Sequence, residues 1–82
     1  MKEQSDATLF CAVGECVEFM RTVKTRSPDA DEVEVVEKGA VYKAVRLTGY
    51  GWDLELFRGI GPKYVRILNS QMPEYVRLWN AT

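Results

Sequence analysis

Aromatic side chains next to glycines are the first residues of this sequence that could bind a partner. Tyr50 and Trp52 alternate with glycines in the segment Gly49-Tyr-Gly-Trp52, so we expect exposed rings at the tip of a turn. Tyrosine and tryptophan dominate protein interfaces, and this turn therefore predicts a partner-binding site. For Trp52 there is a structural alternative, in which the large ring folds back and closes one end of a small core.

A second candidate site is a sheet face on which aromatic residues and arginines alternate. The tripeptide Tyr-Val-Arg occurs at 64–66 and again at 75–77, and we expect its valines to point inward in both copies. The predicted outer face consists of Tyr64, Arg66, Tyr75, Arg77 and Trp79, joined by Tyr42 and Arg46 from an earlier strand. Such a face suits base stacking or contact with a protein. The alternative is an ordinary solvated face, with some of the tyrosines lining the core.

Acidic residues gather in the segment from 29 to 37. They are Asp29, Asp31, Glu32, Glu34 and Glu37. Their spacing differs from the Asp-x-Asp-x-Asp-Gly pattern of a calcium loop, so we expect no metal site there. A solvated loop is the simpler interpretation, and the alternative is a surface that imitates nucleic acid or binds a basic protein.

Charge divides unevenly along the chain. From Met1 to Lys38, nine acidic residues against five basic ones give −4, and from Gly39 onward three acidic against six basic ones give +3. Such a division is expected for a protein with one acidic and one basic face, or by chance in a short chain. The net charge of −1 lacks the clear positive excess that is typical of a nucleic-acid-binding protein.

Groups that could carry out catalysis are scarce. The sequence has no histidine, which removes the commonest general base and the commonest metal ligand. It has no Gly-x-Ser-x-Gly, P-loop or dinucleotide-binding motif. Cys11 and Cys16 are too few for a zinc site and are interpreted as free thiols, the alternative being a local disulfide or redox pair. We therefore expect no enzyme, no metal and no cofactor.

A chain of 82 residues accommodates one domain, and we assign residues 1–82 to it, with residues 1–8 as an N-terminal tail. The hydrophobic content of 46% is sufficient for a folded core. No apolar run approaches the ~18 residues that cross a bilayer, and the polar start has no signal-peptide pattern. We therefore expect a soluble cytoplasmic protein without a membrane partner.

Alternating apolar residues, separated by glycine and proline turns, predict an all-β fold of short strands. The strands are expected over 14–23, 33–36, 40–47, 53–57, 63–68 and 74–79. A polar loop over 24–32 and a 3₁₀ turn over 69–73 connect them. For Ala7 to Met20 a helix competes with a strand, because Leu9, Val13, Cys16, Val17 and Met20 also fall at helical spacing.

Short antiparallel strands of this number are typical of a small barrel or sandwich, since closing the sheet removes unpaired edges. The segment Gly39-x-Val-Tyr-x-x-Val45, followed by the late Tyr75-Val-Arg-Leu-Trp79, is similar to small single-domain SH3-like proteins encoded by bacteria and their phages. The resemblance implies a five-stranded antiparallel SH3-like barrel over about residues 13–80. The Ala-Leu-Tyr-Asp-Tyr stretch of peptide-binding SH3 domains is absent, so binding of proline-rich peptides is not expected.

The leading functional hypothesis is a non-enzymatic protein-interaction module, encoded by a phage or mobile element, that binds and modulates or inhibits a host protein. Its predicted contact residues are Tyr50, Trp52, Tyr64, Arg66, Tyr75, Arg77 and Trp79. The alternative is nucleic-acid binding through the aromatic and arginine face. A third hypothesis is a homo-oligomer that pairs through an edge strand.

Overall fold

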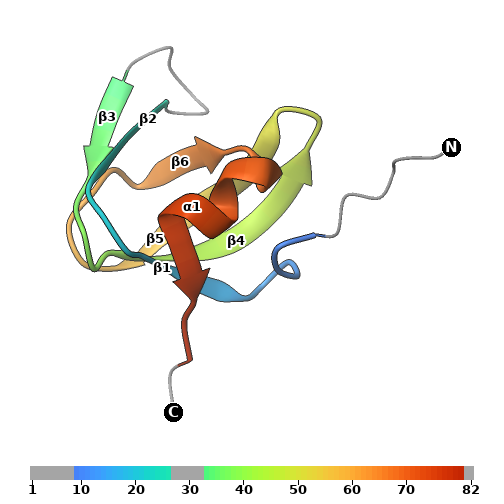
Figure 1. Ribbon diagram of the computed structural model, residues 1–82, viewed down its shortest axis with the longest axis horizontal. Helices are drawn as coiled ribbons and strands as arrows, with labels where there is room; N and C mark the ends of the chain where they lie inside the picture. The colour runs from blue at the N-terminus through green and yellow to red at the C-terminus, as the bar shows by residue number, and fades with distance from the viewer. Residues whose placement is uncertain (1–8, 27–32, 81–82) are drawn as a thin grey trace, which may run out of the picture.

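Antiparallel strands make up most of the structure, a computed structural model that describes residues 9–26 and 33–80 (Figure 1). In chain order the strands are β1 (Cys16–Phe19), β2 (Val23–Arg26), β3 (Val33–Val36), β4 (Val41–Thr48), β5 (Gly51–Arg58), β6 (Tyr64–Ile67) and β7 (Val76–Leu78). A 3₁₀ turn η1 (Asn69–Gln71) and a one-turn helix α1 (Met72–Tyr75) connect β6 to β7. The all-β class expected from the sequence is confirmed, and the 3₁₀ turn lies inside its predicted range.

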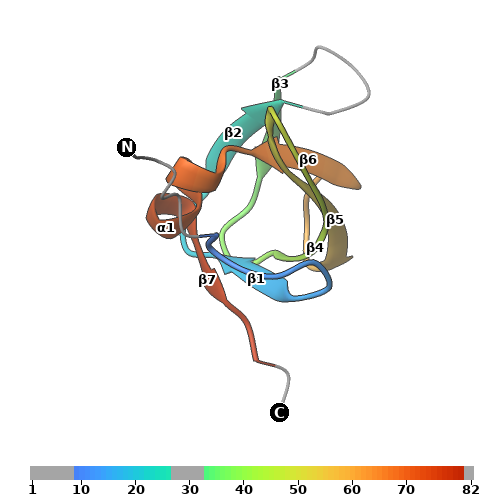
Figure 2. The ribbon, with the colours of Figure 1, turned by 90° about the vertical axis from the view of Figure 1, so that its right-hand side faces the viewer.

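Hydrogen bonds join the described strands in the order β3-β2-β6-β5-β4-β1-β7, and every neighbouring pair is antiparallel. The strands curl around a common interior, with α1 beside β7 (Figure 2). The β2–β3 ribbon meets the other strands through a single residue pair, Arg26 with Arg66. No pairing between β3 and β7 joins the two ends of this order in the described ranges, so a closed five-stranded barrel is not shown.

The strand expected over 14–23 is divided in two. Val17 and Phe19 are buried in β1 and alternate with the half-buried Cys16 and Glu18, so burial has a period of two and the helical alternative is wrong for this segment. A bend at 20–22 then separates β1 from β2, which occupies the first part of the predicted loop. At the bend, the Met20 N–H donates to the Tyr75 carbonyl at 2.8 Å.

The core consists of the inward side chains of the curved sheet, closed at one side by Met72 of α1. Trp52, only 1% exposed, is among its largest members, and its indole N–H donates to Asn69 Oδ1 at 2.9 Å. Tyr42 is also fully buried, so the expectation that it joins the outer face is wrong. Its hydroxyl donates to the Pro62 carbonyl at 2.6 Å, and burial followed by the charge of Glu34 raises the pKa of Tyr42 to about 12.

The strand expected over 74–79 begins late, because Pro73 starts a helical turn. Proline fits the first turn of a helix, where its missing N–H removes no hydrogen bond. Tyr75 therefore ends α1, half-buried against the core, and only Val76–Leu78 form β7. No helix in the described ranges is long and apolar enough to span a membrane.

Trp52 and Tyr50, two residues apart in sequence, have opposite environments, and substitutions should separate them. We expect Trp52→Phe to lower the free energy of unfolding by about 2 kcal/mol, because it leaves a void and removes the hydrogen bond to Asn69. Tyr50, 76% exposed, is the matched control, and Tyr50→Ala should cost less than about 1 kcal/mol. Urea unfolding followed by tryptophan fluorescence measures both, and equal losses would contradict this assignment of the core.

Candidate functional site

The outer face of the sheet carries four of the predicted contact residues. Val65, Ile67 and Val76 point inward and are buried. On the opposite side of the same strands or directly after them lie Tyr64, Arg66, Arg77 and Trp79. The remaining three are placed differently, because Trp52 and Tyr75 belong to or pack on the core, whereas Tyr50 projects from the turn between β4 and β5.

Bulges at Val45 and Phe57 determine which side chains of β4 and β5 reach this face. The register passes from Ala44–Leu54 directly to Arg46–Asp53, so Val45 is an extra residue in β4. It passes again from Tyr42–Leu56 to Val41–Arg58, which makes Phe57 the extra residue in β5. A bulge changes the alternation of side chains and thereby re-aims them. Arg46 is thus brought opposite Asp53, and Phe57 and Arg58 both come close to Trp79.

The first outer group, which we call the Asp53 cluster, comprises Asp53, Arg46, Arg66 and Tyr50. Asp53 is only 3% exposed, and its Oδ2 accepts from Arg46 Nε and Nη2 at 3.0 and 2.8 Å. Arg66 donates from Nε to Oδ1 at 2.7 Å and from Nη2 to Oδ2 at 3.3 Å. The Arg66 guanidinium in turn lies 5.8 Å from the centre of the exposed Tyr50 ring. The buried carboxylate therefore fixes two arginines, and one of them, Arg66, lies beside the Tyr50 ring.

The protonation of Asp53 is controlled by these arginines. Burial by itself would raise the pKa of the Asp53 carboxyl, because a charge loses solvation in the interior. The hydrogen bonds and charges of Arg66 and Arg46 outweigh burial and hold the pKa below its usual value. Asp53 is thus ionised at neutral pH, and it is a structural counter-ion rather than a proton donor.

The second outer group, the Trp79 cluster, comprises Trp79, Phe57 and Arg58. The rings of Phe57 and Trp79 are 5.7 Å apart, and the Arg58 guanidinium lies 5.3 Å from the Trp79 ring centre. Val41 pairs with Arg58 and is only 2% exposed, yet it is not part of the main core. Phe57 remains 57% exposed, so the cluster presents an apolar surface to solvent.

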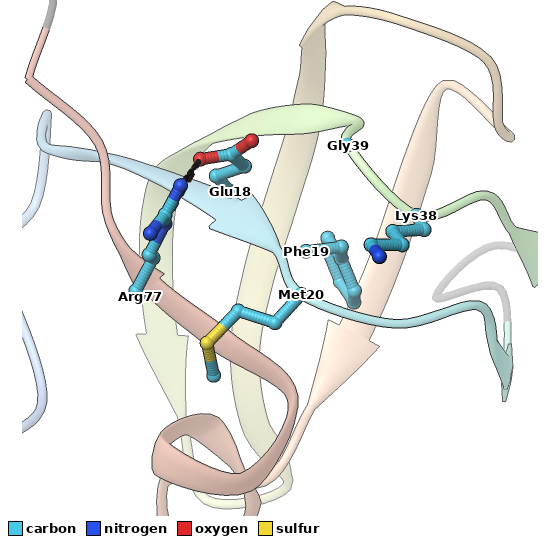
Figure 3. Close-up of a pocket in the computed structure, with 6 residues that line it drawn as sticks. All are labelled: Glu18, Phe19, Met20, Lys38, Gly39 and Arg77. Atoms are coloured by element: carbon cyan, nitrogen blue, oxygen red, sulfur yellow. Dashed lines mark hydrogen bonds and ion pairs between the residues drawn. The ribbon is translucent and has the colours of Figure 1, made fainter.

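An open pocket of about 280 Å³ lies near the ends of β1 and β7 (Figure 3). It is lined by Glu18, Phe19, Met20, Lys38, Gly39 and Arg77. Arg77 donates from Nε and Nη2 to Glu18 Oε1 at 3.0 and 2.9 Å, and the two side chains form one wall. Lys38 lies on the other side of Met20, and its ammonium forms no ion pair with any residue in the described ranges. The pocket thus combines an apolar thioether with two cations and one carboxylate.

Part of this surface was not predicted from the sequence. Phe57, Arg58, Met20 and Lys38 were missed, although adjacent apolar residues at Leu56 and Phe57 break the alternation and were an available signal of a bulge. Asp29, Asp31 and Glu32 of the acidic stretch lie outside the described residues. In the part of the chain that the structure describes, no three cysteine or acidic side chains gather as metal ligands.

The described thiols and carboxylates offer little for catalysis. Cys11 and Cys16 are free cysteines, so no disulfide joins them. Burial and the nearby Glu15 raise the pKa of the Cys11 thiol to about 11, which keeps it protonated and weakly nucleophilic. Asp53 and Glu55 share the outer face of β5, but Asp53 is bound by two arginines and Glu55 accepts a 3.5 Å contact from the Tyr64 hydroxyl.

Comparisons with protein-family models, with curated proteins and with solved structures found no match to this chain.

The Asp53 cluster predicts a specific dependence of stability on pH. Because the folded-state pKa of Asp53 lies below its unfolded value of about 3.9, its ionisation stabilises the fold above that pH and ceases to do so as pH falls through the folded pKa. Asp53→Asn should lower the free energy of unfolding by about 2 kcal/mol at pH 7. The difference from the wild type should shrink as pH falls below about 4 and through the lowered folded-state pKa of Asp53. Urea unfolding across this range measures it.

Glu18→Gln is the matched control for this experiment. Glu18 also pairs with an arginine, but its own side chain is 25% exposed whereas that of Asp53 is 4% exposed, so we expect a loss of less than about 1 kcal/mol. A difference between wild type and Asp53→Asn that does not shrink at any pH below about 4 at which the protein is still folded would contradict the role assigned to the Asp53 carboxylate.

Proposed function

We propose that this protein is a non-enzymatic protein-interaction module, and that the Trp79 cluster together with the neighbouring pocket is the surface that contacts its partner. The observation that carries the proposal is the pair of adjacent rings, Phe57 and Trp79, on the outer face and outside the main core. Phe57 lies in a bulge and is 57% exposed. A phenylalanine that packed in the interior would instead have an inward, buried side chain. Tryptophan, other aromatic residues and arginine are the types that contribute most to binding energy at interfaces.

The pocket supports this proposal because it lies close to the cluster across the sheet. Glu18 pairs with Arg77 of β7 on one side and with Val41 of β4 on the other, and Val41 pairs with Arg58. The Glu18–Arg77 ion pair, which lines the pocket, is thus in register with Val41 and Arg58 of the β4–β5 pair. The exposed rings of the Trp79 cluster and the neighbouring pocket together form a surface that a partner of complementary shape can pack against.

Charge indicates the kind of partner. Arg58, Arg77 and Lys38 surround this surface, and Glu18 is its one lining carboxylate among the described residues. A partner surface with acidic side chains around an apolar centre would complement it. The resemblance to SH3-like proteins implies a more specific function, in which the module is encoded by a phage and its partner is a host protein.

We further propose that the chain has the connectivity of an SH3-like small barrel, located in the cytoplasm. The support is the order of elements: a ribbon β2–β3 after the first strand, a 3₁₀ turn before the last strand, and β7 antiparallel to β1. A fold of this kind is compatible with many functions, so the functional proposal depends on the Trp79 cluster and not on the fold.

Photo-crosslinking tests the contact surface. Phe57 is replaced by a benzoylphenylalanine, and the protein is irradiated in lysate of its native host. We expect one protein-sized adduct, at least about fivefold reduced by the charge reversals Lys38→Glu and Arg58→Glu, because an acidic partner would be repelled. Arg21→Glu reverses a charge on an exposed residue outside the pocket and the cluster, and it should leave the adduct unchanged.

The same photoreactive group at Leu68, which is 47% exposed after β6, is the positional control and should give no such adduct. Equal labelling from both positions, or labelling that survives both charge reversals, would contradict the proposal. An adduct with the mass of two chains would instead identify a homo-oligomer, the third hypothesis drawn from the sequence.

A further inference from the structure

We propose that the opposite end of the same outer face, formed by the Asp53 cluster with Tyr64 and Lys63, binds single-stranded nucleic acid. This surface is distinct from the Trp79 cluster, so the inference goes beyond the proposed protein interaction and does not depend on it. Its residues come from the β4–β5 turn, from β4 and β5, and from β6 and the residue before it.

The first argument is the pairing of rings with cations. Arg66 lies 5.8 Å from the centre of the Tyr50 ring, and Lys63 Nζ lies 5.5 Å from that of Tyr64. Tyr50 is 76% exposed, so its ring presents area to solvent beside a fixed guanidinium. An unpaired base stacks on such a ring while the neighbouring cation faces its phosphate. Aromatic platforms in basic surroundings are the usual arrangement for binding single strands without sequence preference.

The second argument is charge. The basic side chains on this part of the face are Lys43, Arg46, Lys63 and Arg66, and the acidic ones are Asp53 and Glu55. They leave a local charge of +2, although the whole chain carries −1. The Arg46 side chain is 67% exposed despite its bonds to Asp53, so its guanidinium can reach a ligand in solvent. A polyanion is the partner that this charge complements.

The third argument is pre-organisation. Asp53 is 3% exposed and is saturated by hydrogen bonds from Arg46 and Arg66, so it holds both guanidiniums in place without presenting negative charge at the surface. Two fixed arginines lose less side-chain entropy on binding than two mobile ones. A structural role alone would not require an exposed tyrosine above Arg66.

The geometry favours a single strand over a duplex. No helix in the described ranges projects from this face to enter a major groove, and stacking on Tyr50 requires a base that is not already stacked in a duplex. An acidic protein is the competing occupant. It would use the same cations, but it has no base to stack on the Tyr50 ring, and polyglutamate stands for it in the test below.

Fluorescence anisotropy tests the proposal, with labelled oligo-dT and oligo-U of twelve nucleotides, a duplex of the same length, and polyglutamate as a polyanion without bases. We expect both single strands to bind at least about tenfold more tightly than the duplex or polyglutamate. Tyr50→Ala should weaken single-strand binding about tenfold without changing its salt dependence, since it removes stacking and no charge. Arg46→Gln should reduce the slope of log K against log salt by about 0.7, the value for one lost phosphate contact.

Arg21→Gln removes the same charge from the bend between β1 and β2 and should change neither the affinity nor the slope. The variant Tyr50→Ala keeps the test valid if Arg46→Gln perturbs the fold, which thermal unfolding would reveal. Absence of single-strand binding at low salt, equal binding of polyglutamate, or full affinity in Tyr50→Ala would overturn the proposal. Each of these results leaves the Trp79 cluster untouched, so failure here is distinguishable from failure of the proposed protein interaction.

Discussion

Pairing of β4 with β5 is the constraint on which the outer face of this protein depends. Both strands are eight residues long, and their bulges at Val45 and Phe57 divide the pair into segments of different register. Bulges increase local twist, and this allows the long β4–β5 hairpin to pair with β6 on one side of the curved sheet and with β1 on the other. Residues 52–55 of β5 pair with β6, whereas residues 41–43 of β4 pair with β1. The Asp53 cluster and the Trp79 cluster arise at these two ends.

Each cluster joins aromatic rings to arginine, but the polar groups are satisfied in different ways. Asp53 is nearly inaccessible, and its burial is tolerated because two guanidiniums supply hydrogen bonds and opposite charge. Arg58 of the other cluster has the Trp79 ring beneath it and forms no ion pair with a carboxylate among the described residues, and rings attract cations only weakly at an exposed site. The first arrangement therefore fixes its side chains, and the second leaves Phe57 and Arg58 more able to adapt to a partner.

Much of the secondary structure was predictable, because it follows local patterns. The strands β3 to β6 begin and end within about two residues of the expected ranges, since glycine and proline turns mark their limits. Register was harder to predict: adjacent apolar residues at Leu56 and Phe57 indicate a bulge in β5, but the partner residues across β4, and the second bulge at Val45, are defined only by the pairing itself. Trp52 and Tyr50 share the same glycine context, yet Trp52 lies in β5 on the inward side and bonds to Asn69, seventeen positions away, whereas Tyr50 lies in the turn. Tyr75 left the strand pattern because Pro73 favours a helical turn.

The charge division along the chain also shows why sequence position is a poor guide to surface position. Glu18 belongs to the acidic half of the sequence, but β1 lies between β4 and β7, two strands of the basic half. Its carboxylate is consequently bound by Arg77 and is part of a surface with more cations than anions. For Glu18, a position in the acidic half of the sequence therefore does not mean a position on an acidic face. What matters for binding is which cations the sheet places beside exposed rings, and the antiparallel order places them at both ends of one face.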